Sequence, residues 1–324
     1  MIISGLILGG IVLFALLSVL TLVIFEPVFY GDFYKDAKRE FALPGMSDGF
    51  VQQGFSYGKG AFITSGYMGK AGETSRIYVT KDGESRWVTV KDNKGDDYLG
   101  HAGGISVYGD FVYLCDSDEA RQMLVLSLDE ILDSEEGDAV TAKGAFPVHS
   151  NASFCHVEGD MLYVGEFYRE QNYSTDASHH KTTPAGDKHH SLVFGYKLSA
   201  SAPNGLEESE PVLAYSIVDL AQGMCMTASG KIVITTSWAI ANSHHYVYKK
   251  PAVTAQSTFT LNGKDVPLWY LDTDALDKDI VAPPMSEEVV YVNGRVYTMN
   301  ESASNKYIFG KLLRGTYIWS YPLD

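Results

Sequence analysis

The chain has 324 residues, a formal net charge of −15 and a pI near 5.0. Nucleic-acid backbones are bound by clustered Lys and Arg side chains, so this acidic balance argues against a nucleic-acid partner. The 21 Tyr and 15 Phe residues are typical of a strand-rich protein. The three cysteines match no zinc or disulfide spacing, and we expect them to be small buried side chains in strands.

The first segment of the chain is almost wholly apolar. Residues Ile2 to Phe25 carry no charged side chain, and as a helix rising ~1.5 Å per residue they span roughly 36 Å, enough to cross a bilayer. A cleaved signal peptide begins with basic residues and ends at small ones, and this segment does neither. We therefore predict a single-pass transmembrane anchor over residues 1–25 and a juxtamembrane stalk over residues 26–49.

A strand-pair unit then recurs five times between residue 50 and the C-terminus. Each unit opens with a doublet of small or polar residues, continues as a short apolar strand, and is followed by a turn and a second strand. The five openings are Gln53–Tyr57, Gly103–Val107, Ala152–His156, Gln222–Met226 and Glu287–Tyr291. A unit repeating about every 50 to 70 residues indicates a radial repeat. We predict an all-β five-bladed β-propeller over residues 50–324, with a six-bladed propeller as the alternative.

Each blade is expected to contain four strands in sequence order. The expected fourth strand of blade 2 lies near Val140–Phe146, and that of blade 4 is Val266–Leu271. Blade 5 is expected to end with strands Lys306–Leu312 and Thr316–Tyr321. A strand from the region Phe41–Phe50 could add to blade 5 and close the ring, although nothing in the sequence requires it.

Two polar insertions interrupt the repeat, Arg169–His190 in blade 3 and Lys250–Lys264 in blade 4. We expect both to be long surface loops, which often cover a binding site. The first contains two His pairs, at residues 179–180 and 189–190, which resemble a metal-binding tract. No carboxylate or cysteine lies at a fixed spacing from them, which favours a solvated loop.

One face of the propeller should gather most of the polar side chains. In this fold the innermost strands start, and the second strands end, on the same face beside the axis. The inner ring would contain Gln53, Gly103, Ala152 or Ser153, Gln222, and Glu287 or Glu288. The second ring would contain Tyr67, Asp116, Glu166, Trp238 and Glu301.

The residue types in these rings suggest a binding or catalytic site. The amides of Gln53 and Gln222 either satisfy backbone groups at the strand starts or hydrogen-bond a polar ligand. Glu287 and Glu288 are adjacent on one strand and point to opposite sides, so at most one faces the channel. His101, which lies just before a Gly doublet near the axis, is the best single candidate for a base, a ligand or a hydrogen-bond donor.

The stretches "HAGGISVYGDFVYL" and "PPMSEEVVYVNGRVYTMNESA" resemble secreted or membrane-anchored propellers of the lactonase-like, gluconolactonase-like and strictosidine-synthase-like group. That resemblance implies a divalent cation, calcium, in the central channel, with Glu287 or Glu288 as a ligand; the matching first-blade position holds Gln53 in place of an acid. The blade count of five is closer to carbohydrate-active propellers with three carboxylates around the channel. For those, Asp116, Glu166 and Glu301 are candidates by position.

The leading hypothesis is a membrane-anchored propeller that binds a polar small molecule or a saccharide at this face, with Gln53, Gln222, Glu288, Tyr67 and Trp238 as ligand-binding residues. A second is a hydrolase or lyase that uses His101, Glu287, Asp116, Glu166 and Glu301. A third is an envelope protein-interaction platform that uses the rim loops. The basic residues after the apolar segment favour a cytoplasmic domain, but N-terminal anchors ahead of propellers usually present the domain outside, and we expect an extracytoplasmic propeller.

Overall fold

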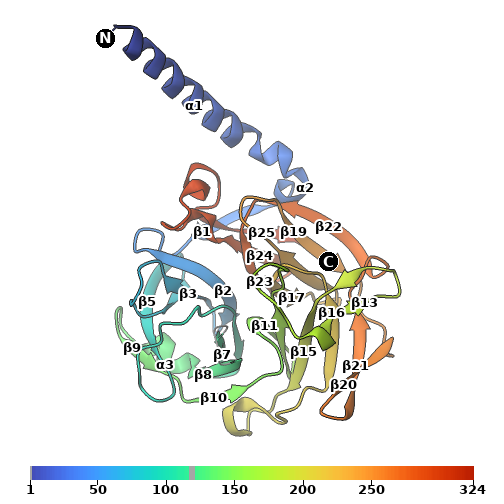
Figure 1. The fold of residues 1–324 in the computed structure, drawn as a ribbon. Coiled ribbons are helices and arrows are strands. Elements are labelled where there is room, and N and C mark those ends of the chain that lie inside the picture. Colours follow the sequence, from blue (N-terminus) through green and yellow to red (C-terminus); the bar gives the residue numbers. More distant parts are fainter. Residues whose placement is uncertain (1, 117–120) are drawn as a thin grey trace.

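The computed structural model describes residues 2–116 and 121–324. Five mainly antiparallel sheets surround a common axis and form the predicted five-bladed propeller, from which helix α1 (Ile2–Phe29) projects (Figure 1). The innermost strands of the blades are β2 (Phe50–Gly58), β6 (Ile105–Tyr108), β11 (Ala152–Glu158), β17 (Ala221–Met226) and β23 (Ser286–Val292). They coincide with the five openings found in the sequence.

The first two blades follow the chain closely. Blade 1 continues outward through β3 (Ala61–Met68), β4 (Arg76–Lys81) and β5 (Glu84–Lys91). Blade 2 continues through β7 (Phe111–Asp116), β8 (Gln122–Ser127), helix α3 (Leu128–Asp133) and, as the outer strand, β10 (Gly144–Pro147). Between them, β9 (Ala139–Thr141) leaves blade 2 and pairs in parallel with β5. The Asp82-Gly83 turn between β4 and β5 has positive φ at both residues, as a tight hairpin requires.

Blade 3 is larger than expected. It contains β12 (Met161–Glu166), β15 (Ser191–Lys197) and β16 (Leu213–Ile217), followed by a hairpin of β21 (Lys264–Tyr270) and β20 (Ser257–Leu261). Because β21 pairs in parallel with β16, the stretch Val266–Leu271 does not form the outer strand of blade 4, as we had expected. The insertion after β12 folds as a 3-10 turn η1 (Ala177–His179) and a small hairpin of β13 (Lys181–Thr182) and β14 (Lys188–His189); a second turn, η2 (Pro203–Gly205), precedes β16.

Blade 4 consists of β17, β18 (Ile232–Thr236), β19 (Ser243–Tyr248) and β22 (Leu276–Ala282). The outer strand β22 was missed because five of its seven residues are polar or half-exposed, as in many edge strands.

Blade 5 closes the ring with both ends of the chain. After β24 (Arg295–Asn300), the connection forms the 3-10 turns η3 (Glu301–Ala303) and η4 (Phe309–Leu312), so the expected strand Lys306–Leu312 is wrong. The next strand is β25 (Tyr317–Pro322), and the outermost is β1 (Lys38–Ala42), which pairs antiparallel with β25. Part of the expected stalk over residues 26–49 therefore belongs to the propeller.

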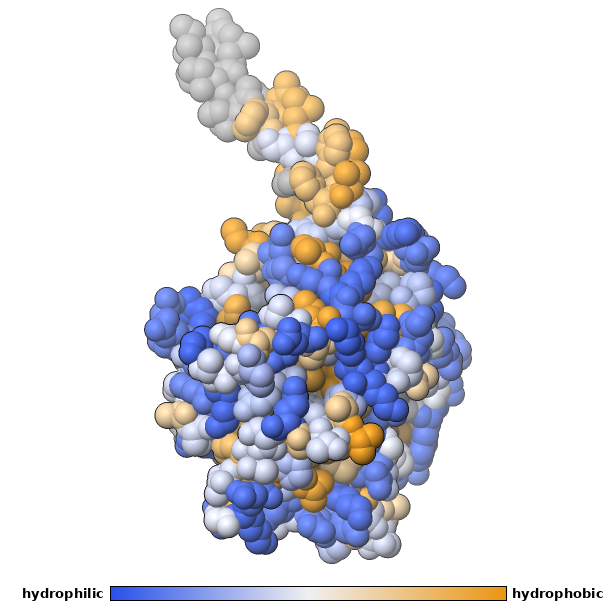
Figure 2. All heavy atoms as spheres, turned by 90° about the vertical axis from the view of Figure 1, so that its right-hand side faces the viewer, coloured by the Kyte–Doolittle hydropathy of each residue, from blue (hydrophilic) through white to orange (hydrophobic). Residues whose placement is uncertain are grey.

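The N-terminal helix is firmly joined to this blade. The short helix α2 (Gly31–Tyr34) follows α1 directly, and its Phe33 is buried among apolar side chains of blades 4 and 5. The Tyr30 hydroxyl donates to Asn242 Oδ1 at 3.1 Å. Among the described residues, one helical stretch, Val12–Phe29, is long enough and apolar enough to cross a membrane. A signal sequence would meet the same criteria of length and composition. Figure 2 shows the apolar surface of this stretch above a largely hydrophilic propeller.

The blades approach one another very closely at the axis. A Cβ added to Gly104 would lie 2.5 Å from the backbone nitrogen of Cys155 in the next blade. A Cβ on Gly223 would lie 2.5 Å from the Cα of Glu288. These contacts confirm that the small residues of the opening doublets allow close packing at the centre.

Candidate functional site

The opening doublets are β-bulges. In blades 1, 3, 4 and 5 the innermost strand has one residue more than its partner at this point. The ladders skip from Gln52 to Gly54, Ala152 to Phe154, Ala221 to Gly223 and Ser286 to Val289. A bulge bends the strand and re-aims a side chain, and bulges are frequent beside binding sites. The extra residues are Gln53, Ser153, Gln222 and one of the pair Glu287–Glu288.

Glu288 joins three other blades at the axis. Its Oε2 accepts the backbone N–H groups of Phe55 at 2.7 Å and Ile105 at 2.9 Å. Its Oε1 accepts the N–H of Cys155 at 2.9 Å. Burial raises the pKa of Glu288 to about 8, although the three N–H donors act in the opposite direction. These contacts make Glu288 a structural group that holds blades 1, 2 and 3 to blade 5.

Glu287 and Glu301 form a buried acidic pair on blade 5. Their exposed fractions are 2% and 8%, and Glu287 Oε1 has no hydrogen-bond partner among the described residues. Burial and the nearby Glu301 raise the pKa of Glu287 well above its ordinary range. Burial raises the pKa of Glu301 to about 7, against the attraction of Lys306. Burial and mutual repulsion therefore favour the protonated form of both carboxyl groups over the doubly ionised pair.

A hydrogen-bonded chain joins this pair to His101. The Gln53 Nε2 group donates to Glu301 Oε2 at 2.9 Å, and Gln53 Oε1 lies 2.6 Å from His101 Nε2. Because an amide oxygen only accepts, His101 Nε2 carries the proton in this arrangement. The His101 ring stacks on Tyr67 with the ring centroids 4.5 Å apart. Residues of blades 1, 2 and 5 thus meet at one mouth of the propeller.

The connection after β24 adds two residues that the sequence did not reveal. Lys306 Nζ donates to the Tyr67 hydroxyl and lies over the rings of Tyr67 and Tyr307. Tyr307 hydrogen-bonds Glu301, and burial raises the pKa of Tyr307 to about 12. Both residues were hidden because this stretch was expected to be a strand.

Blades 3 and 4 contribute an aromatic cluster. Trp238 lies 6.3 Å from both Phe167 and Tyr173, centroid to centroid, and the Arg169 guanidinium stacks over its ring at 4.0 Å. Tyr173 interacts electrostatically with Tyr307, which links the two groups. Tyr173 comes from the blade 3 insertion and gave no signal in the sequence beyond its place in that loop.

The remaining predicted site residues have other partners. Asp116 accepts hydrogen bonds from the Tyr98 hydroxyl and from the amide of Gln122, which lies in β8 of blade 2. Glu166 accepts from the backbone of Asn151 and Leu192 and pairs with His179 at 2.9 Å, all in blade 3. Gln222 donates to Ser237 at 3.2 Å. The described contacts of these three residues do not include Glu287, Glu301 or His101.

The blade 3 insertion is largely exposed, as expected of a surface loop, but two of its histidines are buried. His179 and His189 are each 4% exposed, and His189 Nδ1 lies 3.0 Å from Ser216 Oγ. His190 pairs with Asp219 at 2.8 Å. Each of these rings has a protein partner, which fixes the insertion against blade 3.

The calcium implied by the family resemblance does not fit these residues. No group of three or more His, Cys, Asp or Glu side chains with the arrangement of a metal site occurs in residues 2–116 and 121–324. Both oxygens of Glu288 face N–H donors, whose positive ends would repel a cation.

Comparison with known proteins identifies the fold. No protein-family model and no curated protein sequence matches the chain. The PQQ-bound aldose sugar dehydrogenase from Streptomyces coelicolor is 12% identical, with a TM-score of 0.50, over 88% of this chain and 97% of that one. A gluconolactonase from Xanthomonas campestris is 10% identical, with a TM-score of 0.39, over 89% and 95%. The dehydrogenase match shows a shared propeller fold and nothing beyond the fold.

Proposed function

We propose that this chain is a membrane-anchored propeller that binds a saccharide, or another small molecule rich in hydroxyl groups, at the mouth formed by Gln53, His101, Glu287 and Glu301. The observation that carries the proposal is the buried Glu287 carboxyl, whose Oε1 has no partner among the described residues, beside a hydrogen-bonded chain that ends at His101. Ligand sites typically combine aromatic walls with a few convergent polar groups. The similar structures whose names refer to sugars share only the propeller fold with this chain, so the support for a saccharide ligand comes from the site residues.

Both chemical elements of such a site are present. The carboxyl oxygens accept hydrogen bonds from ligand hydroxyls, and the Gln53 amide and His101 ring contribute further polar contacts. The exposed Tyr173 and the half-buried Trp238 offer apolar faces against which a sugar ring packs. An approaching ligand would first contact His101, Tyr67 and Tyr173, because Glu287 and Glu301 are almost fully buried.

Binding is tested with the full chain in detergent micelles on an array of neutral and acidic oligosaccharides, followed by calorimetry with the best binder. We expect Glu287→Gln, His101→Ala and Trp238→Ala each to weaken binding at least tenfold. Glu84→Gln, on an exposed hairpin of blade 1, is the matched control and should bind like the wild type. Unchanged binding in all three site variants, with unchanged melting temperatures, would exclude this face as the site.

A hydrolase or lyase is the second candidate, favoured by the raised proton affinities of Glu287 and Glu301. Two neighbouring buried carboxyl groups whose pKa values are both raised are suited to sharing a proton in general acid and general base roles. Oligosaccharides bound in the array would be assayed for new reducing or unsaturated ends. A rate that changes near pH 7 and falls about a hundredfold or more in Glu287→Gln supports catalysis; binding without turnover restricts the chain to a binding role.

We also propose that α1 is retained as the anchor and that the propeller lies outside the cytoplasm. The helix runs on into α2, whose Phe33 is part of the packed core, so the chain shows no break at the base of α1. No small residue occurs in the stretch Leu22–Pro27 that a signal-peptide cleavage site would need. We expect the chain to stay in the membrane pellet after alkaline extraction. We also expect protease added to intact spheroplasts to cleave the propeller. A soluble chain that begins after residue 25 would contradict it.

A further inference from the structure

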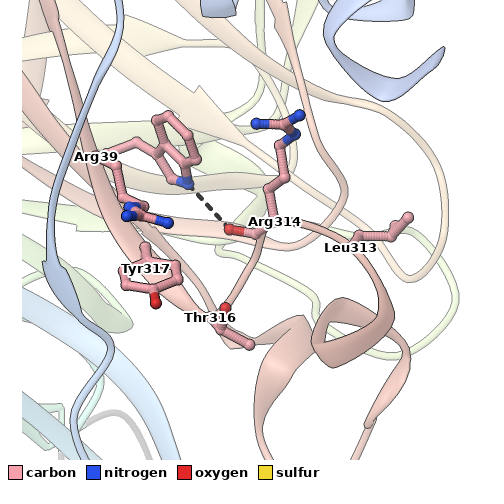
Figure 3. Close-up of a pocket in the computed structure, with 6 residues that line it drawn as sticks. Arg39, Leu313, Arg314, Thr316 and Tyr317 are labelled. Atoms are coloured by element: carbon pink, nitrogen blue, oxygen red, sulfur yellow. Dashed lines mark hydrogen bonds between the residues drawn. The ribbon is translucent and has the colours of Figure 1, made fainter. Parts of the chain in front are cut away.

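A cavity lies at the base of α1, and neither Glu287 nor Glu301 lines it. It has a volume of about 320 Å³ and is lined by Arg39, Leu313, Arg314, Thr316, Tyr317 and Trp319 (Figure 3). Its walls are the outermost strand β1, the strand β25, and the end of the connection that precedes β25. Arg314 Nε lies 3.9 Å from Glu26 Oε2 of α1 and its guanidinium lies 5.7 Å from the Tyr34 ring, which places the cavity beside the helix base.

The two arginines are held in place but have few acidic partners. The Arg39 guanidinium stacks over the Tyr317 ring at 4.5 Å, and no carboxylate among the described residues forms an ion pair with it. The backbone of Arg314 is fixed by the Trp319 indole, which donates to its carbonyl oxygen at 2.9 Å (Figure 3). The Nε of Arg314 is buried and lacks a hydrogen-bond partner within the described chain.

The nearby acids do not neutralise this pair. Glu40 is turned toward Ser320 and Arg295. Glu26 is buried and accepts a hydrogen bond from the Tyr34 hydroxyl at 3.0 Å, so only its second oxygen faces Arg314. The cavity therefore keeps a net positive charge. Guanidinium groups present forked N–H donors that match phosphate oxygens.

The surroundings of the cavity suit the surface of a bilayer. The last turn of α1 exposes Val28 and Phe29 by 72% and 71%, and the connection before β25 exposes Ile308 and Leu312. The exposed Lys311 lies on the same connection. Apolar side chains beside basic ones at the end of an apolar helix are the arrangement expected where lipid headgroups meet the protein.

We propose that the cavity between Arg39 and Arg314 binds the phosphate of an anionic phospholipid headgroup in the leaflet from which the propeller emerges. The volume is at the lower end of the range of about 300–1,000 Å³ for ligand pockets, which suits a headgroup whose acyl chains stay in the bilayer. This proposal rests on the anchoring proposed above, but not on the saccharide site.

Binding is measured by native mass spectrometry of the full chain released from neutral detergent micelles. The micelles are titrated with dihexanoyl phosphatidylglycerol, dihexanoyl phosphatidylcholine, glycerol phosphate or inorganic phosphate. We expect phosphatidylglycerol to bind at least tenfold more tightly than the other three. Equal binding of glycerol phosphate or inorganic phosphate would show a site for free anions and overturn the lipid assignment.

The variants separate a specific site from general attraction of charge. Arg39→Gln with Arg314→Gln should weaken phosphatidylglycerol binding at least tenfold, and Arg39→Lys with Arg314→Lys should restore it only in part, because lysine lacks the fork. The control removes two exposed cations elsewhere, Lys81→Gln with Lys278→Gln, and should bind like the wild type.

Arg39→Gln alone, at an exposed strand position, provides a milder change should the double variant unfold. Wild-type binding by the folded double variant would overturn the proposal. The micelle measurement does not depend on whether α1 spans a bilayer in cells, so failure of the alkaline-extraction test and failure here are separate results.

Discussion

The strongest prediction concerns the carboxyl group of Glu288 at the axis. Replacing Glu288 by Gln keeps the shape of the side chain but gives it one acceptor oxygen, so an amide NH₂ must face at least one backbone N–H. Leaving one buried N–H unpaired costs about 1–3 kcal/mol. Glu288→Met leaves all three N–H groups unpaired, and the cost becomes on the order of 3–9 kcal/mol, comparable with the whole stability of about 5–15 kcal/mol of a typical domain.

The two variants are compared by urea unfolding, followed by tryptophan fluorescence and far-ultraviolet circular dichroism. Hydrogen exchange should show faster exchange at the amides of Phe55, Ile105 and Cys155, which lie in three different blades. Glu84→Gln is the control for loss of one carboxylate at the surface. A loss below about 1 kcal/mol in Glu288→Met, or unchanged protection of the three amides, would refute the assignment of Glu288 as the group that joins the blades.

Three further results follow from the structure. Burial raises the pKa of Glu301 from 4.5 to about 7, so the protonated side chain stabilises the fold fully below pH 4.5. This contribution is lost as the pH rises to about 7. The melting temperature should therefore fall over that pH range, and it should fall less steeply in Glu301→Gln. Gly104→Ala should cost about 1–3 kcal/mol in urea unfolding, because its Cβ meets backbone atoms, whereas Gly31→Ala, with open space around it, should be neutral. Phe33→Ala should cost about 3–5 kcal/mol locally and speed hydrogen exchange in β22, leaving blade 2 unchanged.

The sequence was sufficient to predict the inner half of each blade. Those strands must be apolar and must begin with small residues, because neighbouring backbones approach within van der Waals distance at the axis. The outer strands have no such constraint. The apolar stretch Val266–Leu271 looked like the edge of blade 4, yet its backbone pairs with β16 of blade 3, and the polar β22 takes its place. Pairing between blades is a tertiary property that local patterns do not encode.

The site was predictable to the extent that it depends on the bulges. Gln53 was found because it opens the repeat, Glu287 because it departs from that opening, and His101 because it directly precedes a Gly doublet. The structure joins Gln53 and His101 to Glu301 by hydrogen bonds. Lys306 and Tyr307 were not found, since a run of apolar and aromatic residues after β24 gives the same pattern whether it forms a strand or a folded loop.

The closure of blade 5 by β1 determines the order in which the protein can be completed during synthesis. The edge strand β1 emerges from the ribosome first, but its partner β25 begins roughly 275 residues later. At ~5–20 residues per second, β1 waits about 14–55 s with its hydrogen-bonding edge unpaired. Its sequence, Lys-Arg-Glu-Phe-Ala, puts three charges on that edge, which discourages pairing with other chains in the interval. The charges that made this segment resemble a stalk would therefore protect the nascent chain until the ring can close.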